Sequence, residues 1–180
     1  MTLIDTDQQI PSFKKLVEAI HQESGKIVIQ INHAGRQTSS SVTGSPIVAP
    51  SAIPCPVRNE MPKELSQEEI QKIVDAFGEA ARRVKETGAD GVEIHMAHGY
   101  LLNQFLSPFS NQRTDEYGGD PERRMKMAIE VLRTVRNQVG PDFTILCRLS
   151  ADEYVEGGLK LKDTQEIAKA LERSGTDALH

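Results

Sequence analysis

Short apolar runs typical of buried strands alternate along this chain with longer segments whose apolar residues recur every three or four positions, as on one face of a helix. The expected strands are residues 26–31, 90–95, 143–149 and 177–180. Because no hairpin signal joins consecutive strands, they are expected to pair in parallel through right-handed helical crossovers. The pattern indicates the α/β class, in which ligands bind at the carboxyl ends of the strands.

The expected helices, each bounded by residues that favour helix ends, cover residues 10–23, 67–87, 121–139 and 164–173. Ser66 and Glu69 form a capping box before the second of these helices. Asp163 is expected to cap the last one. Residues 32–65 are too long for a simple connection, so they are a candidate for a functional loop or a lid. Residues 96–120 are expected to be mostly loop, with room for one short helix.

Two architectures fit this alternation of strands and helices. One is a doubly wound sheet, and the other is a (β/α)8 barrel, which needs about 250 residues. The chain has 180 residues, so it holds only part of such a barrel. A partial barrel leaves two strand edges open, which is a liability for a free-standing fold.

Composition narrows the function classes. The net charge of −5 leaves no basic stripe for phosphates, so neither nucleic acid nor an acidic membrane surface is an expected partner. No run reaches the roughly 18 to 20 apolar residues of a membrane span, and residues 1–10 lack the features of a signal peptide, so a cytoplasmic protein is expected. Cys55 and Cys147 have no metal or redox spacing and are expected to be free thiols, Cys147 as a small buried hydrophobe.

Polar residues stand at or near the carboxyl end of three successive expected strands. Gln30 precedes Asn32 and His33 on the first, His95 lies on the second, and Arg148 lies on the third. A planar heterocycle with carbonyls and ring nitrogens could pair with the amide of Gln30, and the cation of Arg148 could stabilise a reduced flavin ring. An ordinary hydrogen bond or ion pair inside the core explains either residue alone equally well.

A second group follows the strand 90–95. The imidazoles of His95 and His98 could hold a carbonyl oxygen and polarise an adjoining C=C bond. Tyr100 could then deliver a proton. Taken alone, such a pair is more often two structural histidines beside a core tyrosine. A zinc site is the weakest interpretation because no third ligand is evident. Residues 111–119 are expected to form a rigid surface loop pinned by Arg113 and Asp115.

Three runs of this chain resemble the Old Yellow Enzyme family of flavin oxidoreductases. Within it they are most similar to the bacterial branch of 2,4-dienoyl-CoA reductases and related NADH:flavin oxidoreductases. The runs are QINHAGRQ (30–37), GVEIHMAHGYLLNQFLSPFSNQRTDEYGGDPERR (91–124) and RLSADEYVEGGL (148–159). The likeness covers nearly the whole chain, and the middle run is long enough to be highly specific.

The resemblance implies a (β/α)8 TIM barrel that holds FMN, takes hydride from NADH or NADPH, and reduces an activated alkene such as a small α,β-unsaturated carbonyl compound. By position, Gln30 matches the residue that binds the pyrimidine edge of the flavin, and Arg148 matches the one that contacts its N1 and C2 carbonyl region. His95 and His98 match the pair that holds the substrate carbonyl. Tyr100 matches the tyrosine that protonates the neighbouring carbon.

Residues 1–180 would then be the central part of one FMN-binding TIM-barrel domain, about strands 3 to 6 with their helices. The amino-terminal and carboxyl-terminal strands would be missing, as would any 4Fe-4S cluster, which some members carry in regions outside this part. The full-length protein could form a homo-oligomer. Alone, this part is expected to be inactive and to bind FMN poorly. The alternatives are a non-catalytic half-barrel that needs a complementing chain and a metal-dependent hydrolase built on His95 and His98.

Overall fold

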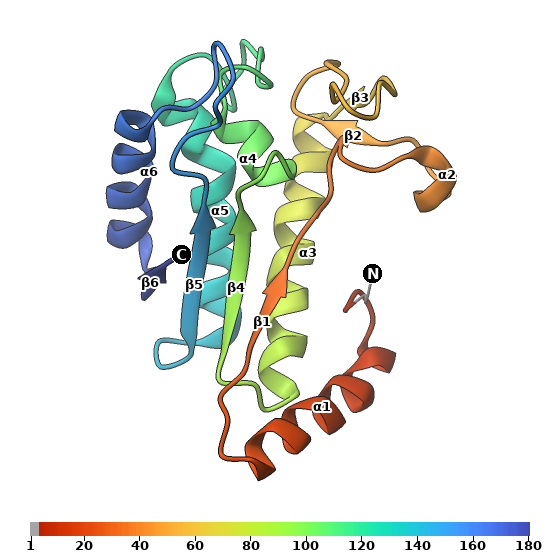
Figure 1. Ribbon diagram of the computed structural model, residues 1–180, viewed down its shortest axis with the longest axis vertical. Helices are drawn as coiled ribbons and strands as arrows, with labels where there is room; N and C mark the ends of the chain where they lie inside the picture. The colour runs from red at the N-terminus through yellow and green to blue at the C-terminus, as the bar shows by residue number, and fades with distance from the viewer. Residues whose placement is uncertain (1–3) are drawn as a thin grey trace.

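The computed structural model describes residues 4–180 and contains one main sheet of four parallel strands (Figure 1). Its strands lie in the order β1-β4-β5-β6. They are β1 (Val28–Ile31), β4 (Gly91–Met96), β5 (Thr144–Leu149) and β6 (Ala178–Leu179). All four expected strands are present and parallel, each within two residues of its expected bounds.

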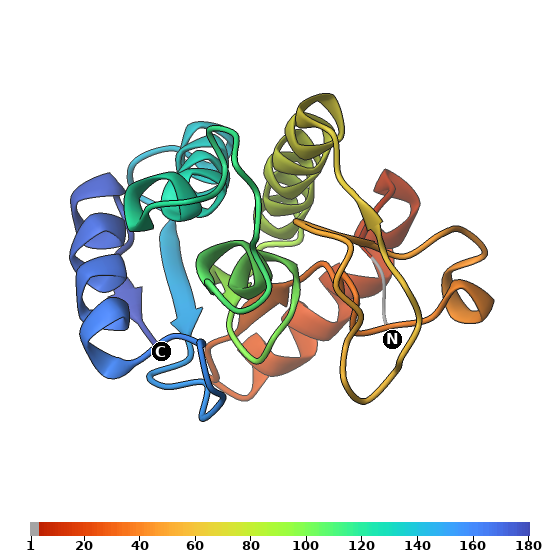
Figure 2. The same ribbon diagram turned by 90° about the horizontal axis from the view of Figure 1, so that it is seen from above.

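Long helices connect these strands and cover one face of the sheet. They are α3 (Gln67–Glu86), α5 (Pro121–Val139) and α6 (Leu161–Ser174), and α1 (Ile10–Gln22) follows the short 3-10 helix η1 (Asp7–Gln9) near the amino ends of the strands. Seen from above, α3 and α5 stand on the same side of the sheet (Figure 2). No helix of the described part is long and apolar enough to cross a membrane.

Alternation along the strands divides their side chains between two faces. One set packs against α3 and α5 in the hydrophobic core: Ile29, Ile31, Val92, Ile94, Met96, Ile145 and Cys147. The other set lies on what we call the open face: Val28, Gln30, Gly91, Glu93, His95, Thr144, Leu146, Arg148, Ala178 and His180. Val28 is 41% exposed on that face, whereas Val92 and Ile145 on the other are fully buried.

Local signals set most helix ends where the sequence predicts them. The Ser66 hydroxyl accepts from the backbone N–H of Glu69, and the Glu69 carboxylate accepts from that of Ser66, so the expected capping box is confirmed. The expected cap at Asp163 is wrong. Helix α6 begins one turn earlier, after Lys160. The backbone N–H of Lys160 donates to the Asp163 carboxylate at 3.0 Å. An acidic residue inside the first turn can thus also stabilise the start of a helix, because its carboxylate accepts from a free backbone N–H there.

Both long connections contain regular structure. Residues 32–65 include the short helix α2 (Ser40–Thr43) and two short parallel strands, β2 (Val48–Ala49) and β3 (Lys63–Glu64). Residues 96–120 contain the one short helix for which the sequence left room, α4 (Leu101–Leu106), and all of its residues are buried. The two connections lie together above the carboxyl ends of the strands in Figure 1.

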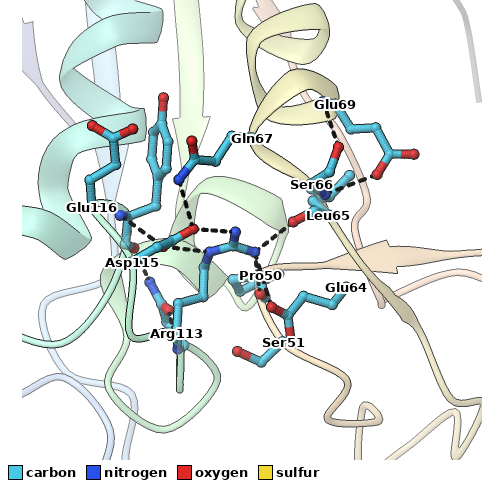
Figure 3. A network of polar contacts seen from close by, with 12 residues as sticks. Pro50, Ser51, Glu64, Leu65, Ser66, Gln67, Glu69, Arg113, Asp115 and Glu116 are labelled. Atoms are coloured by element: carbon cyan, nitrogen blue, oxygen red, sulfur yellow. Dashed lines mark hydrogen bonds and ion pairs between the residues drawn. The ribbon is translucent and has the colours of Figure 1, made fainter.

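Arg113 joins these connections (Figure 3). Its Nη1 donates to the carbonyl oxygens of Pro50 at 2.9 Å and Leu65 at 2.6 Å. Its Nε and Nη2 donate to both carboxylate oxygens of Asp115, which holds the pKa of that carboxyl well below its usual range. Pinning by this pair is confirmed, and the segment lies at the surface only in part: Asn111, Arg113 and Tyr117 are buried, whereas Gln112, Thr114 and Glu116 are exposed. The segment is a polar core for the loops above the sheet.

Arg113→Lys should lower the free energy of unfolding by about 3 kcal/mol, because an ammonium cannot bond two carbonyls and a bidentate carboxylate together. Urea-induced unfolding measures this change. The matched control is Arg123→Lys, which alters an exposed ion pair with Asp120 and should matter far less. Equal losses in both variants would contradict a structural role for the buried guanidinium.

Candidate functional site

The strand register brings the site residues expected from the sequence to one face of the sheet. Gln30 of β1 is paired with Glu93 of β4, and His95 of β4 is paired with Arg148 of β5. Register partners on parallel strands point to the same side, so all four side chains lie on the open face. Gln30 stands one pleat below His95 and Arg148, which lie nearer the carboxyl ends of the strands.

Glu93 also lies on this face, although the sequence analysis assigns it no role in the flavin site. Its carboxylate is nearly buried and accepts a 2.9 Å hydrogen bond from Nε2 of Gln30. On its other side, Nδ1 of His180 lies 2.7 Å from the second carboxylate oxygen. Glu93 lies two residues before His95 on the same strand, so its place on this face could be predicted from the sequence. Its hydrogen bond with His180 could not, because no local pattern connects the two residues.

His95 is 4% exposed and is held in one tautomer. Its Nδ1 accepts from the backbone N–H of Ala97 at 3.2 Å, so the proton of the neutral ring is on Nε2. Nε2 lies 3.3 Å from Nδ1 of His98 and therefore donates to it. Burial, with help from the nearby charges of His98 and Arg148, lowers the pKa of His95 to about 4. His95 is thus a neutral N–H donor at pH 7.

His98 and Tyr100 lie beside this ring. His98 is exposed and has a left-handed backbone with φ of 59°, and its backbone N–H donates to the Ser150 hydroxyl at 2.9 Å. The Tyr100 ring packs edge-on against His95 with 5.0 Å between ring centroids. The three side chains expected to act on a substrate therefore form one cluster. In the present arrangement the N–H of His95 points to Nδ1 of His98. Both imidazoles could donate to one carbonyl oxygen only if that oxygen replaced Nδ1 of His98 as the acceptor for His95.

Arg148 is half-buried, and its guanidinium forms no hydrogen bond or ion pair with any residue in the range 4–180. The neighbouring carboxylate of Glu93 is occupied by Gln30 and His180 instead. A cation left unpaired in this position is available to an anionic or electron-rich group on the open face.

The segment after β1 closes this end of the sheet. The side-chain oxygen of Asn32 is buried without a hydrogen-bond partner in the described part. His33 accepts at Nδ1 from the backbone of Gly35, and burial lowers its pKa. Gly35 has φ of +58°, which favours glycine, and an added Cβ would lie 2.5 Å from Oε1 of Gln104, so any other residue would have to displace this side chain of α4.

Neither cysteine belongs to a possible metal-binding group among the described residues. Cys55 and Cys147 are both buried free thiols, as expected, and burial raises the pKa of Cys147 to about 11. Across residues 4–180, no group of three or more His, Cys, Asp or Glu side chains is arranged to hold a metal ion.

Comparison with known proteins gives a consistent family. A family model described as the NADH:flavin oxidoreductase / NADH oxidase family matches residues 2–180. An NADH oxidase of Thermoanaerobacter brockii is 47% identical over 178 residues, covering 98% of this chain and 27% of its own length. An NADPH dehydrogenase of Listeria innocua is 43% identical over 173 residues, covering 96% of this chain and 50% of its own length.

Solved structures show the same fold. Morphinone reductase superposes with a TM-score of 0.88 at 33% identity, covering 98% of this chain and 52% of its own. An Old Yellow Enzyme homologue from Zymomonas mobilis gives a TM-score of 0.85 at 31% identity, covering 98% of this chain and 53% of its own. The chain thus spans between about a quarter and a half of the relatives it matches. The fold class is confirmed as α/β, a partial (β/α)8 barrel whose inner wall is the open face.

The imidazole of His95 should titrate near pH 4, which NMR of histidine-labelled protein can follow, with His95→Gln identifying the signal. Because this pKa lies below the ordinary value of about 6.5, the unfolded chain binds the proton first as the pH falls. The free energy of unfolding should therefore decrease from about pH 6.5 down to about pH 4. Titration at the ordinary value would contradict the buried, neutral donor.

Proposed function

Because the chain belongs to the NADH:flavin oxidoreductase / NADH oxidase family, we propose that its protein is an FMN-dependent oxidoreductase that takes hydride from NADH or NADPH and reduces an activated alkene. Family membership itself gives the coarser statement, flavin-dependent oxidoreduction. The proposal adds the acceptor, a small α,β-unsaturated carbonyl compound, and a cytoplasmic location.

One observation carries the proposal: an amide and an unpaired guanidinium stand on the same face of the sheet, one pleat apart. Gln30 directs its Nε2 to Glu93, which leaves its carbonyl oxygen to accept from a ligand. Arg148 offers a cation with no partner in the described part. An acceptor beside a cation fits the ring N–H and carbonyl edge of a flavin. When bound, FMN would supply the two-electron carrier between the reductant and the acceptor.

The cluster above this pair fits an unsaturated carbonyl substrate. Neutral His95 has its proton on Nε2, where it could donate to the substrate oxygen once His98 turns away. His98 is exposed, so its ring can turn to add a second N–H. The Tyr100 hydroxyl has no hydrogen-bond partner among residues 4–180 and could give its proton to the carbon beside the carbonyl.

The names of similar proteins support parts of this scheme. An NADH oxidase and an NADPH dehydrogenase are among the relatives, and morphinone reductase also has a structure in complex with tetrahydroNAD. The same set contains a metal reductase of Desulforamulus reducens, 44% identical over 180 residues. The names of these similar proteins therefore do not agree on one acceptor, and the acceptor proposed here rests on His95, His98 and Tyr100.

Tyr100→Phe should slow reduction of an enone such as 2-cyclohexenone by about 10²-fold or more, because the variant cannot donate the proton. Reduction of the bound flavin by NADH or NADPH should be nearly unchanged. Stopped-flow absorbance of the full-length protein separates the two half-reactions. Tyr154→Phe is the matched control, since Tyr154 is 92% exposed on the loop after β5. Equal loss in both half-reactions would count against the proton-donor role.

The open face and strand edges also favour a second candidate, in which this chain is a non-catalytic half-barrel that functions only with a complementing polypeptide. In the described part, β1 and β6 each pair on one side only, and the open face exposes Val28 and Gln30.

The 180-residue chain alone should bind FMN weakly, because it supplies only part of the wall around the ligand. Quenching of FMN fluorescence during a titration measures this affinity, with the full-length protein as the positive control. A tight one-to-one complex with the chain alone would overturn the prediction. It would show that the residues present here suffice for the pocket.

A further inference from the structure

A nearly buried carboxylate lies between groups of the proposed site without having a part in the proposed reaction. The side chain of Glu93 is 10% exposed on the open face. A buried carboxylate is costly unless each oxygen has a hydrogen-bond partner. Glu93 meets this requirement with Nε2 of Gln30 at 2.9 Å and Nδ1 of His180 at 2.7 Å.

These two bonds fix the orientation of the Gln30 amide. A glutamine amide can present either its oxygen or its NH2 group to a neighbour, and the two ends exchange by a half-turn. An ionised carboxylate only accepts hydrogen bonds, so the NH2 end of Gln30 must face Glu93. The carbonyl oxygen then faces away from Glu93 and is free for a ligand.

His180 holds the other carboxylate oxygen in place. Its backbone N–H donates to the carbonyl of Cys147 at 3.0 Å, and its own carbonyl accepts from the N–H of Leu149 at 2.9 Å. The main chain of His180 is thus anchored to β5, and its imidazole reaches Glu93 from this anchor. Both oxygens of Glu93 are engaged, the carboxylate forms no ion pair with Arg148 within the described residues, and the guanidinium is left for a ligand.

We propose that Glu93 is a positioning residue of the flavin pocket: held by His180, it orients the Gln30 amide so that its carbonyl accepts from the ring N–H of the flavin pyrimidine. This inference rests on the proposed function, since it requires a flavin on the open face. Glu93 itself touches no ligand in this scheme. Its effect on the flavin passes through Gln30.

The test compares FMN with 3-methyl-FMN, which lacks the pyrimidine N–H, by fluorescence titration of the full-length apoprotein. Wild-type protein should bind FMN about tenfold more tightly than the methylated analogue, the value of one hydrogen bond of this kind. In Glu93→Gln the neighbour can donate as well as accept, so the Gln30 amide loses its fixed orientation. The preference should then fall toward one, as it should in Gln30→Leu.

Glu172→Gln on the exposed side of α6 is the matched control and should keep the wild-type preference. A preference unchanged in Glu93→Gln but lost in Gln30→Leu would overturn the positioning role and leave the proposed function intact. If wild-type protein bound neither flavin, both the positioning role of Glu93 and the proposed function would be overturned. A purely structural role would weaken binding of both flavins equally and leave their ratio at the wild-type value, which also contradicts the proposal.

A measurement without ligand covers the case in which Glu93→Gln does not fold. In wild-type protein, the Gln30 side-chain amide proton bonded to Glu93 should exchange with solvent more slowly than its partner on the same nitrogen, which NMR can measure. Two equally unprotected protons would show that the carboxylate does not orient the amide, and would overturn the proposal.

Discussion

The parallel register of β1, β4 and β5 is the constraint on which the rest of this structure depends. Register partners on parallel strands share a side, and side chains alternate between the two sides of the sheet. Val92, Ile94 and Ile145 therefore pack beneath α3 and α5, while their neighbours in sequence face the opposite way. A slip of one residue in a single strand would send that strand's polar residues into the helix-covered core.

The polar residues on the open face differ in how the cost of burying a polar or charged group is reduced. Glu93 has one hydrogen-bond partner for each carboxylate oxygen, Gln30 and His180, whereas burial makes His95 a neutral donor. Arg148 has no partner among the described residues, and its half-buried position leaves it open to a ligand. The face thus combines an amide bonded to a carboxylate, a neutral imidazole and a cation without a partner in the described part.

Features set by neighbours in sequence could be predicted, and so could the shared face of Gln30, His95 and Arg148, because parallel pairing follows from the alternation of strands and helices. Side-chain contacts between distant positions could not be predicted. The periodic spacing of apolar residues predicted the four strands of the main sheet, and the capping box at Ser66 predicted the start of α3. Both signals act within a few residues. The start of α6 was misplaced because Asp163 can serve a helix from either of two positions. Strands β2 and β3 are too short for a periodic signal, and the bond between Glu93 and His180 joins residues 87 positions apart.

A crystal structure of the full-length protein grown with FMN tests the central claim most directly, because it locates the ligand without assuming a reaction. Our account predicts the isoalloxazine ring on the open face, within hydrogen-bond distance of both Gln30 and Arg148, with the His95, His98 and Tyr100 cluster beside it. A flavin bound elsewhere, or one that touches Gln30 or Arg148 but not both, would contradict the site described for this chain.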